Sequence, residues 1–223
     1  MPESRVVRRA GDRYRTTGEG TDTSHSFSYA KHYDPDNVGF GPIVAINEER
    51  LAPGACYDEH RHSDADIVTW VLEGVLAHED STGQRGEVQP GVAQRLSAGS
   101  GVTHAERNAS AEHPLRFVQM MLRSTNWDEP EYAQAVVPEG PGLHETVPVH
   151  AGARLLVARP MAETPLEIDA DAGVLVHVAR GTVVIDGQTL EEGDELRVGD
   201  AVRLLVEGDE AEVLVWLLVG PQG

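Results

Sequence analysis

From Pro42 onward, the chain consists of short runs of β-branched and apolar residues that are separated by glycine, proline and acidic turns. Consecutive side chains of a strand point to opposite faces, whereas a helix shows apolar residues at a sustained spacing of about 3.6 residues. The runs have the lengths of strands, and almost none shows the helical spacing. The only helix we expect is a short one around Glu129 to Val136. The pattern therefore predicts an all-β fold of antiparallel strands.

Two phrases of the sequence occur twice, in the same order. Residues 178–183 (VARGTV) resemble residues 71–76 (VLEGVL), and residues 190–194 (LEEGD) resemble residues 88–92 (VQPGV). Each phrase places a glycine turn next to an apolar run. Because the copies lie roughly 105 residues apart in both cases, they indicate an internal duplication of one small β-barrel.

The length of the chain agrees with such a duplication. Its 223 residues are enough for two domains of about 100 residues each. A polar, proline-bearing stretch between the two halves has the composition of a linker. We therefore expect a first barrel with an N-terminal arm over residues 1–123, a linker with the short helix over residues 124–143, and a second barrel over residues 144–223.

An excess of acidic residues limits the partners of the chain. It has 37 Asp and Glu against 18 Lys and Arg, a formal net charge of −19, which disfavours direct binding to nucleic acids.

No apolar run approaches the roughly 20 residues that cross a bilayer, and we find no secretory signal at the N-terminus. The single cysteine, Cys56, cannot form an internal disulfide, and we expect it to be buried. We expect a cytoplasmic protein without a membrane partner, and a monomer.

Two pairs of metal-binding residue types occur at the same spacing. His60 and His62 lie two residues apart, and 42 residues later His104 and Glu106 repeat this spacing. In a strand, residues i and i+2 point to the same face, so each pair can share one ion. If the two strands are neighbours, four ligands converge inside the barrel and leave one or two positions for water, dioxygen or substrate. Imidazole and carboxylate suit several transition metals, so the residue types do not select one.

The residues around these pairs resemble the two motifs of the cupin superfamily. The first motif is matched by Gly54, His60, His62 and Gly74, and the second by Gly91, Gly99, His104 and Asn108. Two positions depart from the usual pattern. Asp66 and Ile67 stand where a glutamate usually follows the first histidine pair, and Ser97 replaces the usual proline of the second motif.

A more specific resemblance, to the pirin family, covers about residues 23–123. It rests on Glu106, two residues after His104, and on the phrases HSFSY at residues 25–29, YDPD at 33–36, GFGP at 39–42, IVTWVLEG at 67–74 and SAGSGVTH at 97–104. In that family the positions of His60, His62, His104 and Glu106 bind the metal, usually thought of as iron. The resemblance implies two cupin-type, jelly-roll-like antiparallel β-barrels in tandem. The second half resembles the family only in the spacing of its strands and turns, so we expect a degenerate barrel without a metal.

Three functional hypotheses follow from the resemblance. The first is a metal-dependent dioxygenase that opens the ring of a flavonol such as quercetin with dioxygen, with Fe(II) as the expected ion and Cu, Ni, Mn, Co or Zn as alternatives. Glu106 is then the candidate catalytic residue, because it can leave the metal and accept the hydroxyl proton of a small aromatic substrate. The second is a metal- or redox-dependent regulatory protein that binds a metabolic enzyme or a transcription partner. The third, weaker one is a sugar or small-molecule isomerase.

The remaining histidines have no partner at a useful spacing. We expect surface positions for His78, His113, His144 and His150. His25 and His32 are expected to be structural, with a role in the pocket as the alternative. His177 offers no pair for a second metal site, and Trp70 is expected in the core.

Overall fold

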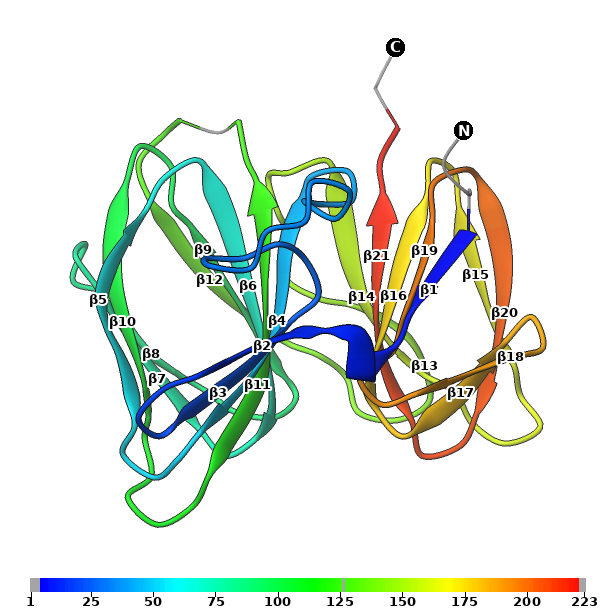
Figure 1. Ribbon diagram of the computed structural model, residues 1–223, viewed down its shortest axis with the longest axis horizontal. Helices are drawn as coiled ribbons and strands as arrows, with labels where there is room; N and C mark the ends of the chain where they lie inside the picture. Colours follow the sequence, from blue (N-terminus) through cyan, green and yellow to red (C-terminus); the bar gives the residue numbers. More distant parts are fainter. Residues whose placement is uncertain (1–4, 126, 221–223) are drawn as a thin grey trace. The chain divides into compact units, whose positions relative to one another are not determined.

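The computed structural model describes residues 5–125 and 127–220, and its regular structure is almost entirely β (Figure 1). The exception is a short 3₁₀ turn, Ala10–Asp12. Within the described residues, no helix is long and apolar enough to span a membrane. The all-β, antiparallel class expected from the sequence is confirmed.

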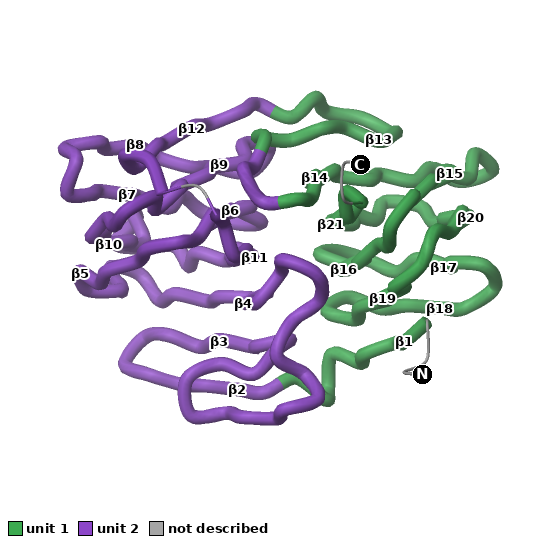
Figure 2. The backbone as a smooth tube through the Cα atoms, turned by 90° about the horizontal axis from the view of Figure 1, so that it is seen from above, with its two compact units in different colours: residues 1–13, 137–148, 152–223 green, residues 14–136, 149–151 purple. Residues whose placement is uncertain are grey.

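The strands belong to two compact units, which are coloured separately in Figure 2. Unit 2 comprises residues 14–136 and 149–151, and unit 1 comprises residues 1–13, 137–148 and 152–223. Residues 1–4, 126 and 221–223 of the expected domains lie outside the described residues.

Unit 2 contains two antiparallel sheets. Its strands are β2 (Tyr14–Thr17), β3 (Thr21–His25), β4 (Ile43–Leu51), β5 (Cys56–His62), β6 (Ala65–Glu73), β7 (Leu76–Asp80), β8 (Arg85–Val88), β9 (Val92–Ser97), β10 (Val102–Asn108), β11 (Leu115–Arg123) and β12 (Glu131–Val136). One sheet has the order β12-β9-β6-β11-β4-β3-β2, and the other has the order β5-β10-β7-β8.

Unit 1 repeats this arrangement. Its strands are β1 (Arg5–Arg8), β13 (Gly142–Glu145), β14 (Ala153–Arg159), β15 (Leu166–Ala170), β16 (Val174–Arg180), β17 (Thr182–Ile185), β18 (Gln188–Glu191), β19 (Glu195–Val198), β20 (Val202–Gly208) and β21 (Glu212–Leu218). The order β19-β16-β21-β14 matches β9-β6-β11-β4, and β15-β20-β17-β18 matches β5-β10-β7-β8. Each of these strands of unit 2 thus has its counterpart ten strands later, as the internal duplication predicts.

Two segments differ from the expected organisation. Residues 131–136, expected as a helix, form β12, which pairs with β9. The helix prediction is wrong because the edge of β9 offers a full row of backbone partners, and because Tyr132 and Gln134 alternate along the strand. The Tyr132 hydroxyl donates to Gln94 Oε1 at 2.8 Å and accepts from Gln134 Nε2 at 2.7 Å. Strand β1, expected in the arm of the first barrel, instead pairs with β19 of unit 1.

The interiors of the two units differ in chemistry. A large cluster of buried aliphatic residues in unit 1 is drawn from both of its sheets. In unit 2, β6 contributes Ile67 to one smaller cluster and Val71 to another. Thr69 lies between them and is also buried. Because alternate residues of a strand share a face, this order leaves a polar belt between two apolar layers inside unit 2.

Candidate metal centre

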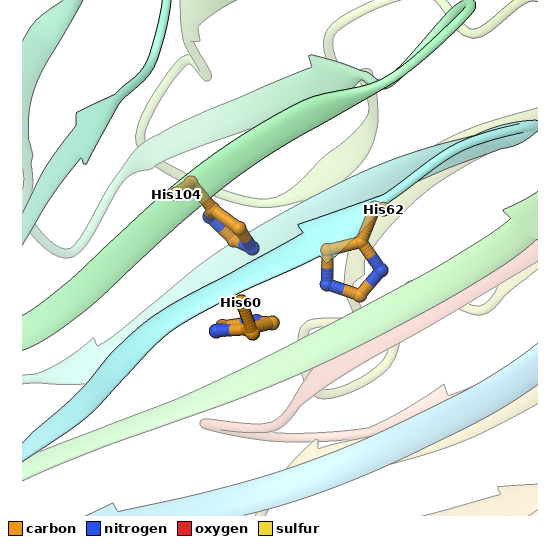
Figure 3. A group of neighbouring side chains, drawn as sticks. All are labelled: His60, His62 and His104. Atoms are coloured by element: carbon orange, nitrogen blue, oxygen red, sulfur yellow. The ribbon is translucent and has the colours of Figure 1, made fainter.

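Three imidazoles meet on neighbouring strands of the four-stranded sheet of unit 2 (Figure 3). His60 of β5 lies opposite His104 of β10, and His62 lies opposite Val102. The ring centroids are 4.4 Å apart for His60 and His104, 4.9 Å for His60 and His62, and 5.1 Å for His62 and His104. One ligand nitrogen of each ring lies within 4.8 Å of the other two. The strand alternation and the pairing of β5 with β10 together produce this convergence.

Glu106 is buried two residues further along β10. The pairing of β10 with β5 is irregular between His104 and Glu106, so that Glu106 lies opposite Tyr57. A carboxylate oxygen of Glu106 lies within 4.8 Å of a ligand nitrogen of His104 and of one of His78. Oε2 of Glu106 accepts a hydrogen bond from Gln119 Nε2 at 2.7 Å. The four residues singled out in the sequence therefore form one cluster through His104, and His78 extends it.

The imidazoles of His62 and His104 are uncharged and offer lone pairs at neutral pH. Burial, together with the nearby His60 and His62, lowers the pKa of His104 to about 3. Burial, and then His60, lowers the pKa of His62 to about 4. Nδ1–H of His60 donates to the backbone oxygen of Asp58 at 2.8 Å, which leaves Nε2 as the acceptor.

Several buried polar atoms of the cluster fit a bound cation. Within the described residues, both ring nitrogens of His104, Oε1 of Glu106 and Nδ1 of His78 have no hydrogen-bond partner. A buried polar group without a partner destabilises a fold by on the order of 1–3 kcal/mol. Imidazole nitrogens with a carboxylate oxygen form a donor set typical of divalent transition metals. The cluster can therefore hold a metal ion.

A cavity of about 420 Å³ lies beside the cluster and is lined by His60 and Glu106. Strands β2 and β3 close another part of its wall, where His25 is buried. The two ring nitrogens of His25 are hydrogen-bonded to Asn47 Oδ1 and Thr16 Oγ1, at 2.9 Å each. Its ring stacks on Tyr29 with a centroid separation of 4.8 Å. His25 thus has structural contacts and also the pocket position that was the alternative expected for it.

The same cavity has an acidic side. The Tyr57 hydroxyl and Thr23 Oγ1 both donate to Oε2 of the buried Glu49 at 2.5 Å. Burial, followed by the negative charge of Glu49, raises the pKa of Tyr57. Tyr57 is therefore a neutral hydroxyl at physiological pH, and the cavity wall combines hydroxyl groups, a carboxylate and aromatic rings.

A row of polar side chains crosses the larger sheet of unit 2 and reaches the cluster through Gln119. The row occupies paired positions on β9, β6, β11 and β4, namely Gln94, Thr69, Gln119 and Asn47. The counterparts in unit 1 are the buried aliphatic residues Leu196, Val176, Val215 and Leu156. None of these four polar residues was predicted from the sequence to lie near the site. A polar residue in one copy where the other copy has an aliphatic one is the signal that could have found them.

The two departures from the cupin motifs contact each other. Ser97 Oγ donates to Oδ1 of Asp66 at 2.6 Å. Oδ2 of Asp66 accepts the backbone N–H groups of His150 at 2.6 Å and Ala151 at 3.0 Å. Asp66 is completely buried. Its carboxylate therefore links His150 and Ala151 to strands β6 and β9 within unit 2, and it has a structural role.

The surface position expected for His78 is wrong. Leu76, His78 and Asp80 alternate onto the buried face of β7. Nε2 of His78 is hydrogen-bonded to Oδ2 of Asp80 at 3.2 Å. The i, i+2 spacing of His78 and Asp80 is the signal in the sequence that could have indicated this contact, because alternate residues of a strand share a face.

The other isolated residues have mixed outcomes. His113 and His150 are exposed, while His144 and His32 are partly exposed. His177 is buried, and its Nδ1 lies 3.3 Å from Oε1 of Glu195. Trp70 is buried as expected, whereas Cys56 is exposed at the first position of β5, so the expectation of burial is wrong.

Two family models match the two halves of the chain. A family model described as Pirin matches residues 7–122, and a second one, described as the quercetinase C-terminal cupin domain, matches residues 138–217. A Mycobacterium tuberculosis protein, provisionally named quercetin 2,3-dioxygenase, is 36% identical over 94% of this chain and 93% of its own length. The Escherichia coli quercetin 2,3-dioxygenase is 29% identical over 94% of this chain and 96% of its own.

Solved structures agree with these matches. The bacterial pirin YhhW from Escherichia coli, in complex with nickel(II), has a TM-score of 0.91 at 27% identity and covers 97% of this chain and 100% of its own. A quercetin 2,3-dioxygenase from Acinetobacter baumannii shares the fold, with a TM-score of 0.77 at 16% identity over 95% of this chain and 78% of its own. With a family match over half of its residues and a duplicated cupin-type architecture, the chain belongs to the pirin family.

Proposed function

We propose that this pirin is a metal-dependent dioxygenase that opens the ring of a flavonol with dioxygen, with quercetin as the first substrate to test. The observation that carries the proposal is a cluster of buried polar atoms without a partner in the described residues, beside a cavity of about 420 Å³ that is lined by His60 and Glu106. Cavities of about 300–1,000 Å³ are typical of sites for small organic ligands. Relatives that match nearly the whole chain carry the name of this activity.

We assign the ion to His60, His62, His104 and Glu106, and we propose Fe(II) as its identity. Histidine with carboxylate ligation and open coordination positions is typical of non-haem Fe(II) oxygenases. The ion, when bound, supplies Lewis acidity to the hydroxyl and carbonyl oxygens of the flavonol.

The protein's own groups orient the substrate and accept its proton. Tyr29 and His25 offer aromatic surface on one wall of the cavity, against which a flat substrate can pack. Glu106 has one oxygen held by Gln119, while Oε1 has no partner within the described residues. Oε1 would bind the ion, and it would take the proton once it has left the ion. Burial raises the pKa of Glu106 to about 7, against the opposing hydrogen bond from Gln119. This value belongs to the metal-free carboxyl, so it applies to Glu106 once it has left the ion, and a base with a pKa near the working pH is well suited to proton transfer.

Metal binding is expected to strengthen as the pH rises toward 7, because Glu106 must lose its proton to bind the ion. Below its pKa of about 7 the metal-free carboxyl is protonated, so binding releases one proton there and none well above it. The logarithm of the association constant should therefore gain about one unit per pH unit from this group below about pH 7. His62 and His104 add no slope near neutral pH, since their pKa values are about 4 and about 3.

Calorimetric titration of the wild type and of Glu106→Gln over this pH range measures the effect. The variant should show weaker binding and a slope smaller by about one proton. Equal slopes in the two proteins would contradict the assignment of Glu106 as a titrating ligand.

The activity itself is tested with an oxygen electrode. Protein purified without metal, then loaded separately with Fe(II), Cu(II), Ni(II), Mn(II) or Co(II), is mixed with quercetin. We expect oxygen uptake together with loss of the flavonol absorbance for at least one ion, and none for the metal-free protein. Absence of uptake above the protein-free rate with all five ions would overturn the proposed function.

A further inference from the structure

We propose that His78, held in place by Asp80, is a further residue of the metal centre and presents its Nδ1 lone pair to the coordination sphere of the bound ion. The inference rests on the proposed metal site of unit 2. Ligand atoms of His78, His104 and Glu106 lie within 4.8 Å of one another. His104 therefore belongs both to this group and to the group that it forms with His60 and His62.

The contacts of His78 resemble those of a histidine prepared for a metal. Its Nε2 is hydrogen-bonded to Oδ2 of Asp80 at 3.2 Å, and both side chains are buried. The other oxygen of Asp80 accepts the N–H of Thr82 at 2.9 Å and its hydroxyl at 2.6 Å, which fixes the carboxylate. A carboxylate accepts N–H, so Nε2 carries the proton and Nδ1 keeps its lone pair. Metal-binding histidines typically donate their second ring N–H to a carboxylate or carbonyl in this way.

The strand register directs His78 toward the proposed ligands. On β7 and β10, His78 lies opposite Glu106, and Asp80 lies opposite His104. The ring centroids of His78 and His104 are 5.4 Å apart, close to the 5.1 Å between His62 and His104. Nδ1 of His78 and Oε1 of Glu106 are both buried acceptors without a partner in the described residues. A cation can stabilise acceptors that are gathered in one buried group.

The second copy of the barrel gives an independent argument. The paired positions Ile185 and Val206 of unit 1 correspond to His78 and Glu106 of unit 2. Both belong to the aliphatic cluster that fills unit 1, as do Leu204 and Ile168, the counterparts of His104 and His60. His78 is therefore one of a set of interior positions at which unit 2 has a potential ligand and unit 1 has an aliphatic residue.

Metal titration of His78→Leu and Asp80→Asn tests the inference. Leucine is chosen because unit 1 holds isoleucine at the equivalent position, and Asp80→Asn keeps the side-chain shape while removing the charge. His177→Gln is the matched control, since it alters a buried histidine that contacts an acid, Glu195, in unit 1. Metal-free proteins are titrated with Co(II), and both the dissociation constant and the visible absorption of the bound ion are recorded.

We expect a dissociation constant about 10- to 100-fold higher for His78→Leu, with an altered Co(II) spectrum, and a smaller increase for Asp80→Asn. The control should match the wild type in both measurements. Dissociation constants within about twofold of the wild type, with unchanged spectra, in both variants would overturn the inference.

Two further outcomes are informative. If circular dichroism shows that His78→Leu is unfolded, Asp80→Asn decides by the same criteria. If the wild type binds neither Co(II) nor any other divalent ion and also shows no oxygen uptake, the proposed function is refuted. Tight binding by the wild type and by both variants refutes only the role of His78.

Discussion

Replacing His104 by alanine is expected to lower the affinity for the metal by more than about 100-fold and to abolish flavonol turnover. His104 is the residue that joins the ligand group of His60 and His62 to that of Glu106 and His78. Its side chain is almost completely buried, and neither ring nitrogen has a partner within the described residues.

The matched control is His113→Ala, which removes an exposed imidazole from the same unit. Elemental analysis after dialysis without chelator measures the bound metal, and the oxygen electrode measures turnover. The control should retain both. A His104→Ala protein that still carries one equivalent of metal would contradict the assignment of the centre.

Replacing Asp66 by alanine is expected to destabilise the metal-free protein by on the order of 3–5 kcal/mol, because three donors lose a buried charged acceptor. These donors are the Ser97 hydroxyl and the backbone N–H groups of His150 and Ala151. Urea unfolding measures the change. The exposed Asp171→Ala should stay within about 0.5 kcal/mol of the wild type.

The same variant tests whether Asp66, which lies near the usual position of the cupin glutamate, acts on the metal ion. Under conditions in which Asp66→Ala remains folded, its metal affinity should equal that of the wild type. A large loss of affinity without loss of structure would show that Asp66 acts on the ion.

The features that depend on local sequence periodicity could be predicted. Short alternating runs indicated an all-β chain, and the repeated glycine-turn phrases indicated two related barrels, which the matching strand orders confirm. The i, i+2 spacing of His60 and His62, and of His104 and Glu106, predicted side chains on one face, and the pairing of β5 with β10 brings the three imidazoles together.

The features that depend on long-range pairing could not be predicted. Strand β1 pairs with β19, far away in the sequence, and β12 forms because β9 has an open edge. The inward position of His78 depends on which face of β7 is buried, and a single short strand does not reveal this. The burial of Asp66 and its contact with Ser97 likewise follow from the register of β6 with β9.

The proposed function requires one metal ion at the His60, His62, His104 and Glu106 cluster for a dioxygenase reaction on a flavonol. The most direct measurement is mass spectrometry of the quercetin products formed under isotopically labelled dioxygen, as the metal-free protein receives increasing amounts of Fe(II). We expect both atoms of a dioxygen molecule to enter the products and the rate to rise until about one equivalent of metal is bound. Products without the label, or a rate that is independent of the bound metal, would contradict the proposed function.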